Sequence, residues 1–197
     1  GIREFLQLSH ATASIPIRIH INGSRGKSSV TRLVAAGLRA GGLKVLAKTT
    51  GTAPRVIGFD GRDRTVHRLR SASISEQIKV LDSFSKQRPD AVVLECMAVQ
   101  PQYQWICEHQ MVRATLGVIT NVRPDHLTEM GPSLKNVALS MSNTIPKNSK
   151  VIIGDDNFTK EFSAVAKQRN TEVEIVGADS VTNSEIALFP ETVHADN

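Results

Sequence analysis

A short run rich in glycine, Gly23-Ser24-Arg25-Gly26-Lys27-Ser28-Ser29, carries the residue types that bind nucleotide phosphates. Glycines allow backbone N–H groups to turn inward around phosphate oxygens, and a helix that begins at such a loop adds a favourable dipole for an anion. The Lys27 ammonium would neutralise the β- and γ-phosphates, and the Ser28 hydroxyl would bind Mg²⁺. The run therefore predicts binding of ATP with Mg²⁺.

The spacing of this loop is Gly-x-x-Gly-Lys-Ser. The commoner Gly-x-x-x-x-Gly-Lys-Ser form would need glycine where Ile21 stands. A chance glycine turn before a helix is the alternative, and the flanking segments decide between the two. Residues 16–22 alternate isoleucine with polar side chains, which is typical of a strand, and residues 27–40 place apolar side chains on one helical stripe. A strand before the loop and a helix after it favour a phosphate loop.

Polar residues also follow three other apolar runs. Lys48-Thr49-Thr50-Gly51 follows the second run, Glu95 ends the third, and Asn121 follows the fourth. Ligands of open parallel sheets bind outside the carboxyl ends of the strands, so these groups would face one crevice with the loop. Polar strand ends are common in any α/β protein, which is the alternative. Glu95 argues against it, because a carboxylate after a buried run is costly unless it is paired or binds a metal such as the nucleotide's Mg²⁺.

A third signal is Thr120-Asn121-Val122-Arg123-Pro124-Asp125-His126. A lone histidine is most often a surface or structural residue. This one follows a predicted strand by a few residues, beside Asp125, which could orient its ring. A metal or phosphate role for His126 is the hypothesis that follows.

The elements that must position these groups alternate between strand and helix along the chain. Residues 1–14 are interpreted as a leader or linker, and Asp60-Gly61 predicts a hairpin turn between residues 55–59 and 64–69. The predicted strands are 16–22, 43–47, 90–95, 115–120, 150–154, 172–176 and 185–189. The predicted helices are 27–40, one that begins at the capping box Ser73–Glu76, 102–112, 133–144 and 158–169. This order predicts one three-layer α/β domain of the P-loop type over residues 15–197, with a mostly parallel sheet and helices on both faces.

Composition restricts the setting of the domain. No apolar run is long enough to span a bilayer and no signal peptide is visible, although an anchor before Gly1 stays open. Cys96 and Cys107 show no disulfide or metal spacing, which favours core positions in a reducing, cytosolic protein. The net charge is +5, with the excess of basic residues between Arg39 and Arg70. Such a patch suits an anionic partner, namely a nucleotide, an acidic polymer or a nucleic acid, or it is simply a solvated face.

Together these motifs resemble the ATP-binding central domain of the Mur ligase superfamily. The signature elements are Gly26-Lys27-Ser28, Glu95 and Asn121-Val122-Arg123-Pro124-Asp125-His126. The resemblance is closer to one branch, the ligase subunit of poly-γ-glutamate synthase, and runs from about residue 15 to about residue 190. Four stretches carry it, of which the Glu-Cys-Met-Ala-Val run is the most discriminating: Ile17–Gly23, Lys48–Thr52, Glu95–Pro101 and Met130–Pro132. Thr128 stands where this branch usually has an acidic residue, and Arg123-Pro124 also depart from its pattern.

The resemblance implies an amide ligase that forms ADP and phosphate through an acyl phosphate. It implies catalytic roles for Lys27, Glu95 and His126. The implied nucleotide-binding residues are Asn22, Gly23, Ser24, Arg25, Gly26, Lys27, Ser28, Ser29 and Asn121, and the implied metal ligands are Ser28, Thr50, Glu95 and His126.

The implied cofactors are ATP and Mg²⁺, and the implied substrates are glutamate and an anionic poly-γ-glutamate chain. Membrane subunits of a polymer synthase and export complex are implied partners, which would place the protein at the cytoplasmic side of a membrane. A homo-oligomer stays open, no nucleic acid is expected, and family members continue for a further half-length beyond the residues that correspond to Asn197.

Two other functions remain to be separated from the ligase. The basic patch suits a nucleic-acid-stimulated P-loop ATPase, but one Trp, one Tyr and six Phe supply few surfaces for base stacking. A regulatory module that binds ATP without turnover is the other alternative. Glutamate-dependent ADP release, nucleic-acid-stimulated hydrolysis, and binding without hydrolysis are the three outcomes that distinguish them.

Overall fold

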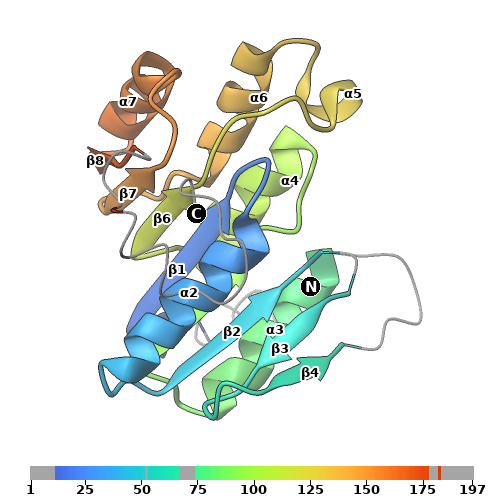
Figure 1. Cartoon of the computed structure of the whole chain (residues 1–197), viewed down its shortest axis with the longest axis vertical. Coiled ribbons are helices and arrows are strands. Elements are labelled where there is room, and N and C mark those ends of the chain that lie inside the picture. Colours follow the sequence, from blue (N-terminus) through green and yellow to red (C-terminus); the bar gives the residue numbers. More distant parts are fainter. Residues whose placement is uncertain (1–11, 52, 67–73, 178–181, 183–197) are drawn as a thin grey trace.

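The computed structural model describes residues 12–51, 53–66, 74–177 and 182, and in them the chain folds around a mostly parallel sheet. The strand order is β4-β3-β2-β5-β1-β6-β7-β8 (Figure 1). The parallel strands are β1 (Ile17–Asn22), β2 (Val45–Thr49), β5 (Ala91–Glu95), β6 (Leu116–Ile119), β7 (Lys150–Ile153) and β8 (Glu172–Ile175). The antiparallel pair β3 (Arg55–Ile57) and β4 (Asp63–Thr65) extends one edge. This confirms the predicted fold class.

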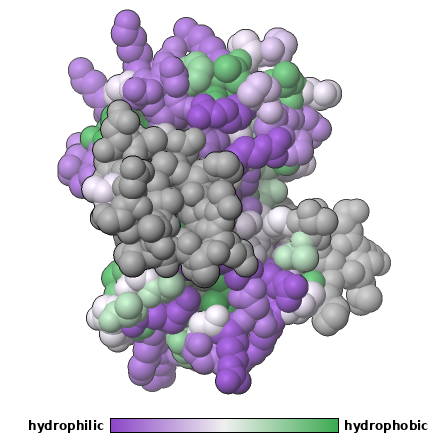
Figure 2. Space-filling view, viewed as in Figure 1, coloured by the Kyte–Doolittle hydropathy of each residue, from purple (hydrophilic) through white to green (hydrophobic). Residues whose placement is uncertain are grey.

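The helices cover both faces of the sheet, as the alternation of strand and helix predicts. Only α2 (Lys27–Ala40) among the described helices packs on the face that carries Ile19 and Ile21 of β1 (Figure 1). The other face is covered by α3 (Ile74–Lys86), α4 (Pro101–Ile106), η1 (Cys107–Val112), α6 (Leu134–Met141), η2 (Ser142–Thr144) and α7 (Thr159–Gln168). A short helix, α5 (Leu127–Met130), precedes α6. Figure 2 shows hydrophilic side chains over much of the upper part of the visible face, where α6 and α7 lie.

Several boundaries differ from those predicted. The second strand runs two residues further, through Lys48 and Thr49, because Lys48 is fully buried and its ammonium lies 2.8 Å from Glu76 Oε1. Apolar periodicity cannot reveal a buried polar strand residue of this kind. The strands of the hairpin are shorter than predicted, because residues 58–62 form the turn, in which Gly58 N–H donates to the Arg62 carbonyl. Residues 67–69 of the predicted hairpin and the predicted strand 185–189 lie outside the described residues.

Two predicted helices change type before they end. The helix predicted over 102–112 begins at Pro101 and becomes a π-helix, η1, at Cys107. The helix predicted over 133–144 begins at its cap, Ser133, and ends in the 3-10 turn η2. Helix α5 was not predicted, since its four residues are too few to show periodicity.

The predicted boundary at residue 14 stays a prediction. Ile15 is fully buried, and Thr12 Oγ1 donates to the Met111 carbonyl at 2.8 Å, so residues 12–15 pack against the domain. Residues 1–11 lie outside the described residues.

Candidate active site

The phosphate loop lies between the carboxyl end of β1 and the first turn of α2, as predicted. Gly23 has φ 135° and Gly26 has φ 79°, conformations that L-residues with a side chain rarely adopt. A Cβ atom on Gly23 would lie 2.0 Å from Thr120 Oγ1 on the neighbouring β6 side. Positive φ thus favours glycine at both positions, and the close approach to Thr120 also requires it at Gly23.

Replacing Gly23 with alanine is expected to weaken ATP binding about tenfold or more, because the new methyl group would push the loop away from Thr120 and strain the backbone. Titration with a fluorescent ATP analogue measures the change. Gly37→Ala is the matched control, since a Cβ there meets nothing within 4 Å and helix α2 gains a better helix former. Equal ATP affinity for the two variants would contradict the steric argument.

The Lys27 side chain folds back over the loop. Its Nζ atom lies 2.6 Å from the Gly23 carbonyl oxygen and 3.2 Å from that of Ser24. The ammonium therefore sits at the loop and the helix N-terminus together, the position from which it can neutralise a bound phosphate.

Glu95 joins the loop to the end of β2. It lies at the carboxyl end of β5, the strand between β1 and β2, and is 3% exposed. Ser28 Oγ donates to Glu95 Oε2 at 2.8 Å, and the Thr50 backbone N–H donates to the same oxygen at 2.8 Å. The structure thus brings together three of the four predicted metal ligands. Hydroxyl and carboxylate oxygens are the donors that Mg²⁺ prefers, so this group fits the ion.

The β6 side of the loop is held by residues 120 and 121. Asn121 Oδ1 accepts the Arg25 backbone N–H at 3.0 Å, and its Nδ2 donates to the Arg25 carbonyl at 3.1 Å. Thr120 Oγ1 donates to the same carbonyl at 2.6 Å. Asn121 therefore fixes the backbone of the loop from the side, and Thr120 is a second residue of this kind that the sequence did not single out.

Two predicted nucleotide-binding side chains turn away from the loop interior. Asn22 Nδ2 donates to Gln104 Oε1 at 3.0 Å and to Thr144 Oγ1 at 3.2 Å on the opposite face of the sheet, while its Oδ1 accepts the Gly23 N–H. Ser24 is buried, and its Oγ donates to the Arg123 carbonyl at 2.9 Å. The hydrogen bonds of Asn22 and Ser24 therefore hold the loop backbone in its shape. Ser29, the remaining predicted residue of this run, is exposed on the first turn of α2.

His126 lies apart from the Glu95 group. It has φ 46° at the cap of α5, and half of its side chain is exposed. Its ring nitrogens lie 3.8 Å from Asp125 Oδ1 and 4.0 Å from Glu129 Oε2, and no hydrogen bond or ion pair joins it to Glu95. Asp125 also lies 3.7 Å from the Arg25 guanidinium, so the segment stays next to the phosphate loop.

Asp155, at the carboxyl end of β7, is a further buried acid at this edge that the sequence argument missed. Burial alone would raise its pKa, but hydrogen bonds from Val122 N–H, Asn157 Nδ2 and Asn157 N–H, together with the charge of Arg123, lower it. Its place directly after a strand is the signal that could have found it.

The face of β1 opposite α2 carries a polar ladder, which is defined here as Arg18, His20 and Asn22 with their partners on α4 and η1. Asn22 bonds Gln104, His20 Nδ1 lies 2.8 Å from Glu108 Oε2, and Arg18 Nε donates to the Val112 and Arg113 carbonyls. Steps of two residues along a strand and of four along a helix have similar lengths, about 6–7 Å, so an antiparallel helix can match the strand rung by rung. The ladder ties the strand that ends in the phosphate loop to the helix behind it.

The central rung is a buried ion pair, with both side chains 1% exposed. Burial by itself would lower the pKa of His20, but the neighbouring Cys96 and Glu108 side chains raise it to about 10. No hydrogen bond of good geometry reaches His20 Nε2, so the 2.8 Å contact with the Glu108 carboxylate is the better supported cause. Burial raises the pKa of Cys107, which keeps this thiol protonated, as expected of a core residue.

Comparison with known proteins agrees with this geometry. Residues 21–195 match the family described as Mur ligase middle domain. The chain belongs to the Mur ligase family. The match covers the phosphate loop, Glu95 and the 121–126 segment within one Mur ligase domain.

Two Bacillus proteins are among the sequences similar to this chain. It is 39% identical over 199 residues to "PGA synthase CapB" of Bacillus subtilis (strain 168), covering 100% of this chain and 51% of that protein. It is 38% identical over 186 residues to "Capsule biosynthesis protein CapB" of Bacillus anthracis, covering 93% and 40%. The chain therefore spans about half of the length of these relatives or less.

The fold of this Mur ligase domain is also that of a solved enzyme, "E. coli FolC in complex with ADP, without folate substrate". The TM-score is 0.67 at 17% sequence identity, over 89% of this chain and 47% of that one. At this identity the likeness concerns the fold alone.

Proposed function

We propose that the protein is an ATP-dependent amide ligase that adds glutamate to a poly-γ-glutamate chain through an acyl phosphate. The observation that supports it most directly lies at the carboxyl edge of the sheet. There the Lys27 ammonium contacts the loop carbonyl of Gly23, and the neighbouring Ser28 hydroxyl donates to Glu95. The names of the two Bacillus relatives, a PGA synthase and a capsule biosynthesis protein, support the choice of polymer.

The proposed reaction has two steps. A carboxylate oxygen of the substrate attacks the γ-phosphorus of ATP, and the bond to ADP breaks, which leaves an acyl phosphate. The amine nitrogen of the next unit then attacks the acyl carbon, an amide forms, the amine loses a proton, and phosphate leaves. Phosphoryl transfer of this kind needs charge neutralisation and alignment more than covalent help from the protein. The Lys27 ammonium and the backbone N–H groups of the loop supply the charge neutralisation. The hydrogen bonds that join the Arg25 backbone to Thr120 and Asn121 keep the loop in place.

Ser28, Glu95 and Thr50 would hold the Mg²⁺ that accompanies ATP. When bound, the ion neutralises phosphate charge and aligns the transferred group. The hydrogen bonds from Ser28 and Thr50 to the Glu95 carboxylate both use Oε2, which would leave Oε1 to bind the ion. His126 is proposed to act near the acyl phosphate, from the segment that Asp125 holds against Arg25.

Replacing Glu95 with glutamine is expected to raise the Mg²⁺ concentration needed for half-maximal ATP turnover about 10- to 100-fold, because a neutral amide binds the ion weakly. Magnesium titrations at saturating ATP measure it. Glu161→Gln on α7 is the control, since that carboxylate pairs with Lys135 on the surface. An unchanged magnesium requirement for Glu95→Gln would remove Glu95 from the metal site.

The overall activity is tested by measuring ADP release with and without glutamate, on the protein in its full natural form. Glutamate-dependent release of ADP, with formation of γ-linked product, is the expected result. Release of AMP, indifference to glutamate, or stimulation by RNA or DNA would contradict the proposal. ATP binding without turnover would instead favour a regulatory module.

The cellular setting is also a proposal. None of the described helices has the length and apolar character that crossing a bilayer requires. We propose that the protein works at the cytoplasmic side of a membrane by association with membrane subunits of the polymer synthase.

A further inference from the structure

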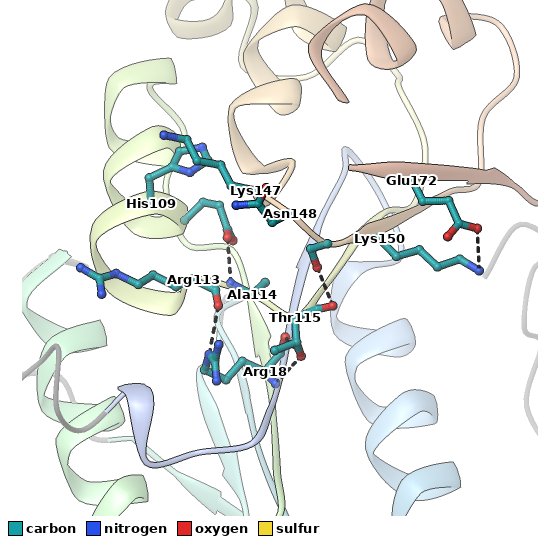
Figure 3. A pocket seen from close by; sticks show the side chains of 11 residues that line it. Arg18, His109, Arg113, Ala114, Thr115, Lys147, Asn148, Lys150 and Glu172 are labelled. Atoms are coloured by element: carbon teal, nitrogen blue, oxygen red, sulfur yellow. Dashed lines mark hydrogen bonds and ion pairs between the residues drawn. The ribbon is translucent and has the colours of Figure 1, made fainter. Parts of the chain in front are cut away.

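A cavity of about 690 Å³ lies at the edge of the sheet opposite the phosphate loop (Figure 3). It opens among the amino ends of β1, β6, β7 and β8, and its lining includes Arg18 and Thr115. Arg18 stands four residues before Asn22 on β1, so the cavity and the loop are separated by about 13 Å along that strand. The chemistry proposed at the carboxyl edge of the sheet does not use it.

The lining of the cavity is basic. Four cations line it, Arg18, Arg113, Lys147 and Lys150, against two carboxylates. Glu108 pairs with His20 and accepts the Ala114 N–H. Lys150 Nζ lies 2.6 Å from Glu174 Oε2 and 3.5 Å from Glu172 Oε1, so these two acids offset its charge, and Arg18, Arg113 and Lys147 are the other cations of the lining.

The histidine of the lining, His109, is also affected by nearby positive charge. Burial, followed by the charges of Arg169 and Lys147, lowers the pKa of His109 to about 4 against the opposing effect of Glu108. His109 is therefore neutral at pH 7, and its ring is held by the Asn143 carbonyl at 3.1 Å. An anion placed here would be attracted by the same charges that disfavour the protonated ring.

The cations surround the cavity and do not converge on one point. In Figure 3, Arg113 and Lys150 extend to opposite sides, Arg18 lies below, and Lys147 lies above beside His109. A compact anion such as phosphate is normally gripped by convergent donors. Charges spread around a space of this size suit an extended anion with several carboxylates, and Ser149 and Asn148 add polar groups between them.

The basic hairpin β3–β4 is a weaker candidate for such a ligand. Arg32 Nη2 lies 2.7 Å from Asp63, and Arg62 and Arg64 both lie 3.9 Å from Asp60. Asp60 therefore offsets part of the charge of Arg62 and Arg64, and Asp63 is paired with Arg32 of α2.

We propose that this cavity is a second substrate site, which holds carboxylates of the growing γ-glutamyl chain away from the ATP site. The identity of the ligand, a γ-glutamyl chain, rests on the proposed function, and the location of the site rests on the cavity. A chain held at two points would remain bound between successive additions, because the second contact is intramolecular.

Fluorescence anisotropy with a labelled γ-glutamyl decamer, without ATP, tests the proposal on the protein in its full natural form. The variant Lys147→Glu/Arg113→Glu is expected to bind the decamer at least about tenfold more weakly, because two attractive contacts become repulsive. Arg62→Glu/Arg64→Glu makes the same change of charge on the hairpin and is expected to bind as the parent does. Lys147→Gln is a milder change of an exposed side chain and should weaken binding about threefold. It provides a separate test if the charge-reversal variant does not fold.

Competition distinguishes the chain from a simple anion. Excess unlabelled γ-glutamyl decamer should displace the labelled decamer. Free glutamate at the same concentration of carboxylate groups should not displace it, and neither should inorganic phosphate at that concentration. Displacement by phosphate as effective as by the decamer, parent-like binding by the cavity variants, or loss of binding in the hairpin variant would overturn the proposal. Glutamate-dependent ADP release is measured on the same samples. Ligation without decamer binding at the cavity would contradict the second substrate site alone, whereas decamer binding without ligation would contradict the proposed function.

Discussion

Lys27→Ala is expected to reduce glutamate-dependent ADP release by about 10²- to 10³-fold or more, since it removes the cation placed at the phosphate loop. The reason is electrostatic: negative charge spreads over the transferred phosphoryl group, and a fixed ammonium stabilises it without reorganisation of the site. Initial rates of ADP formation at saturating ATP and glutamate measure the loss, and the same variant should bind ATP more weakly in direct titration.

The comparison variant for this result is Lys79→Ala, which removes an exposed lysine from α3 and is expected to leave the rate unchanged. Lys27→Arg separates charge from shape, because the guanidinium keeps the charge but not the compact geometry of the ammonium. Retention of more than half of the parent rate by a folded Lys27→Ala protein would show that the loop does not carry the reaction.

Glu108→Ala is expected to destabilise the domain by about 3–5 kcal/mol, because it leaves the His20 imidazolium buried and unpaired. At about 2–4 °C per kcal/mol for a domain of this size, the midpoint of thermal unfolding should fall by roughly 10 °C. The loss also frees the Ala114 N–H, which donates to Glu108 Oε1 at 2.8 Å. Thermal and urea unfolding measure the change.

A double variant distinguishes the ion pair from the packing around it. His20→Leu/Glu108→Leu removes both charges at once and should recover a large part of the stability that Glu108→Ala loses, since apolar replacements of a buried pair are often nearly neutral. If the double variant is as unstable as the single one, the cost lies in the altered volume and not in the unpaired charge.

The same pair predicts how stability depends on pH. The pKa of His20 in the folded protein is raised to about 10, above its ordinary value of 6.5. A raised pKa means that the folded state binds the proton more tightly, so this stabilisation is complete below about pH 6.5 and is lost as the pH rises toward 10. The unfolding free energy of the parent, measured relative to that of the double variant, should therefore fall between these pH values, and a relative value that does not change with pH would contradict a charged His20.

Much of the fold followed from local patterns. Isoleucine at every second position of β1 predicted a strand with one apolar face, and that face packs against α2. The hairpin turn at Asp60-Gly61 is a chemical signal of two residues, and the turn was found at the predicted place. Strand ends that carry polar side chains were harder to predict. Lys48 near the end of β2 is buried because Glu76 of α3 neutralises its charge, and apolar periodicity does not reveal such a pair.

The sequence by itself predicted a phosphate loop, and it determined the loop's backbone shape, since Gly23 and Gly26 act through local geometry before the helix that follows. It also indicated Glu95, because a carboxylate after a buried run requires a partner. Only the tertiary structure decided what that partner is. Strand order places β5 between β1 and β2, which brings Ser28 and Thr50 to one carboxylate oxygen, whereas His126 lies outside that group. The polar ladder behind β1 and the basic cavity at the opposite edge join residues almost a hundred positions apart, and no local pattern encodes contacts of that range.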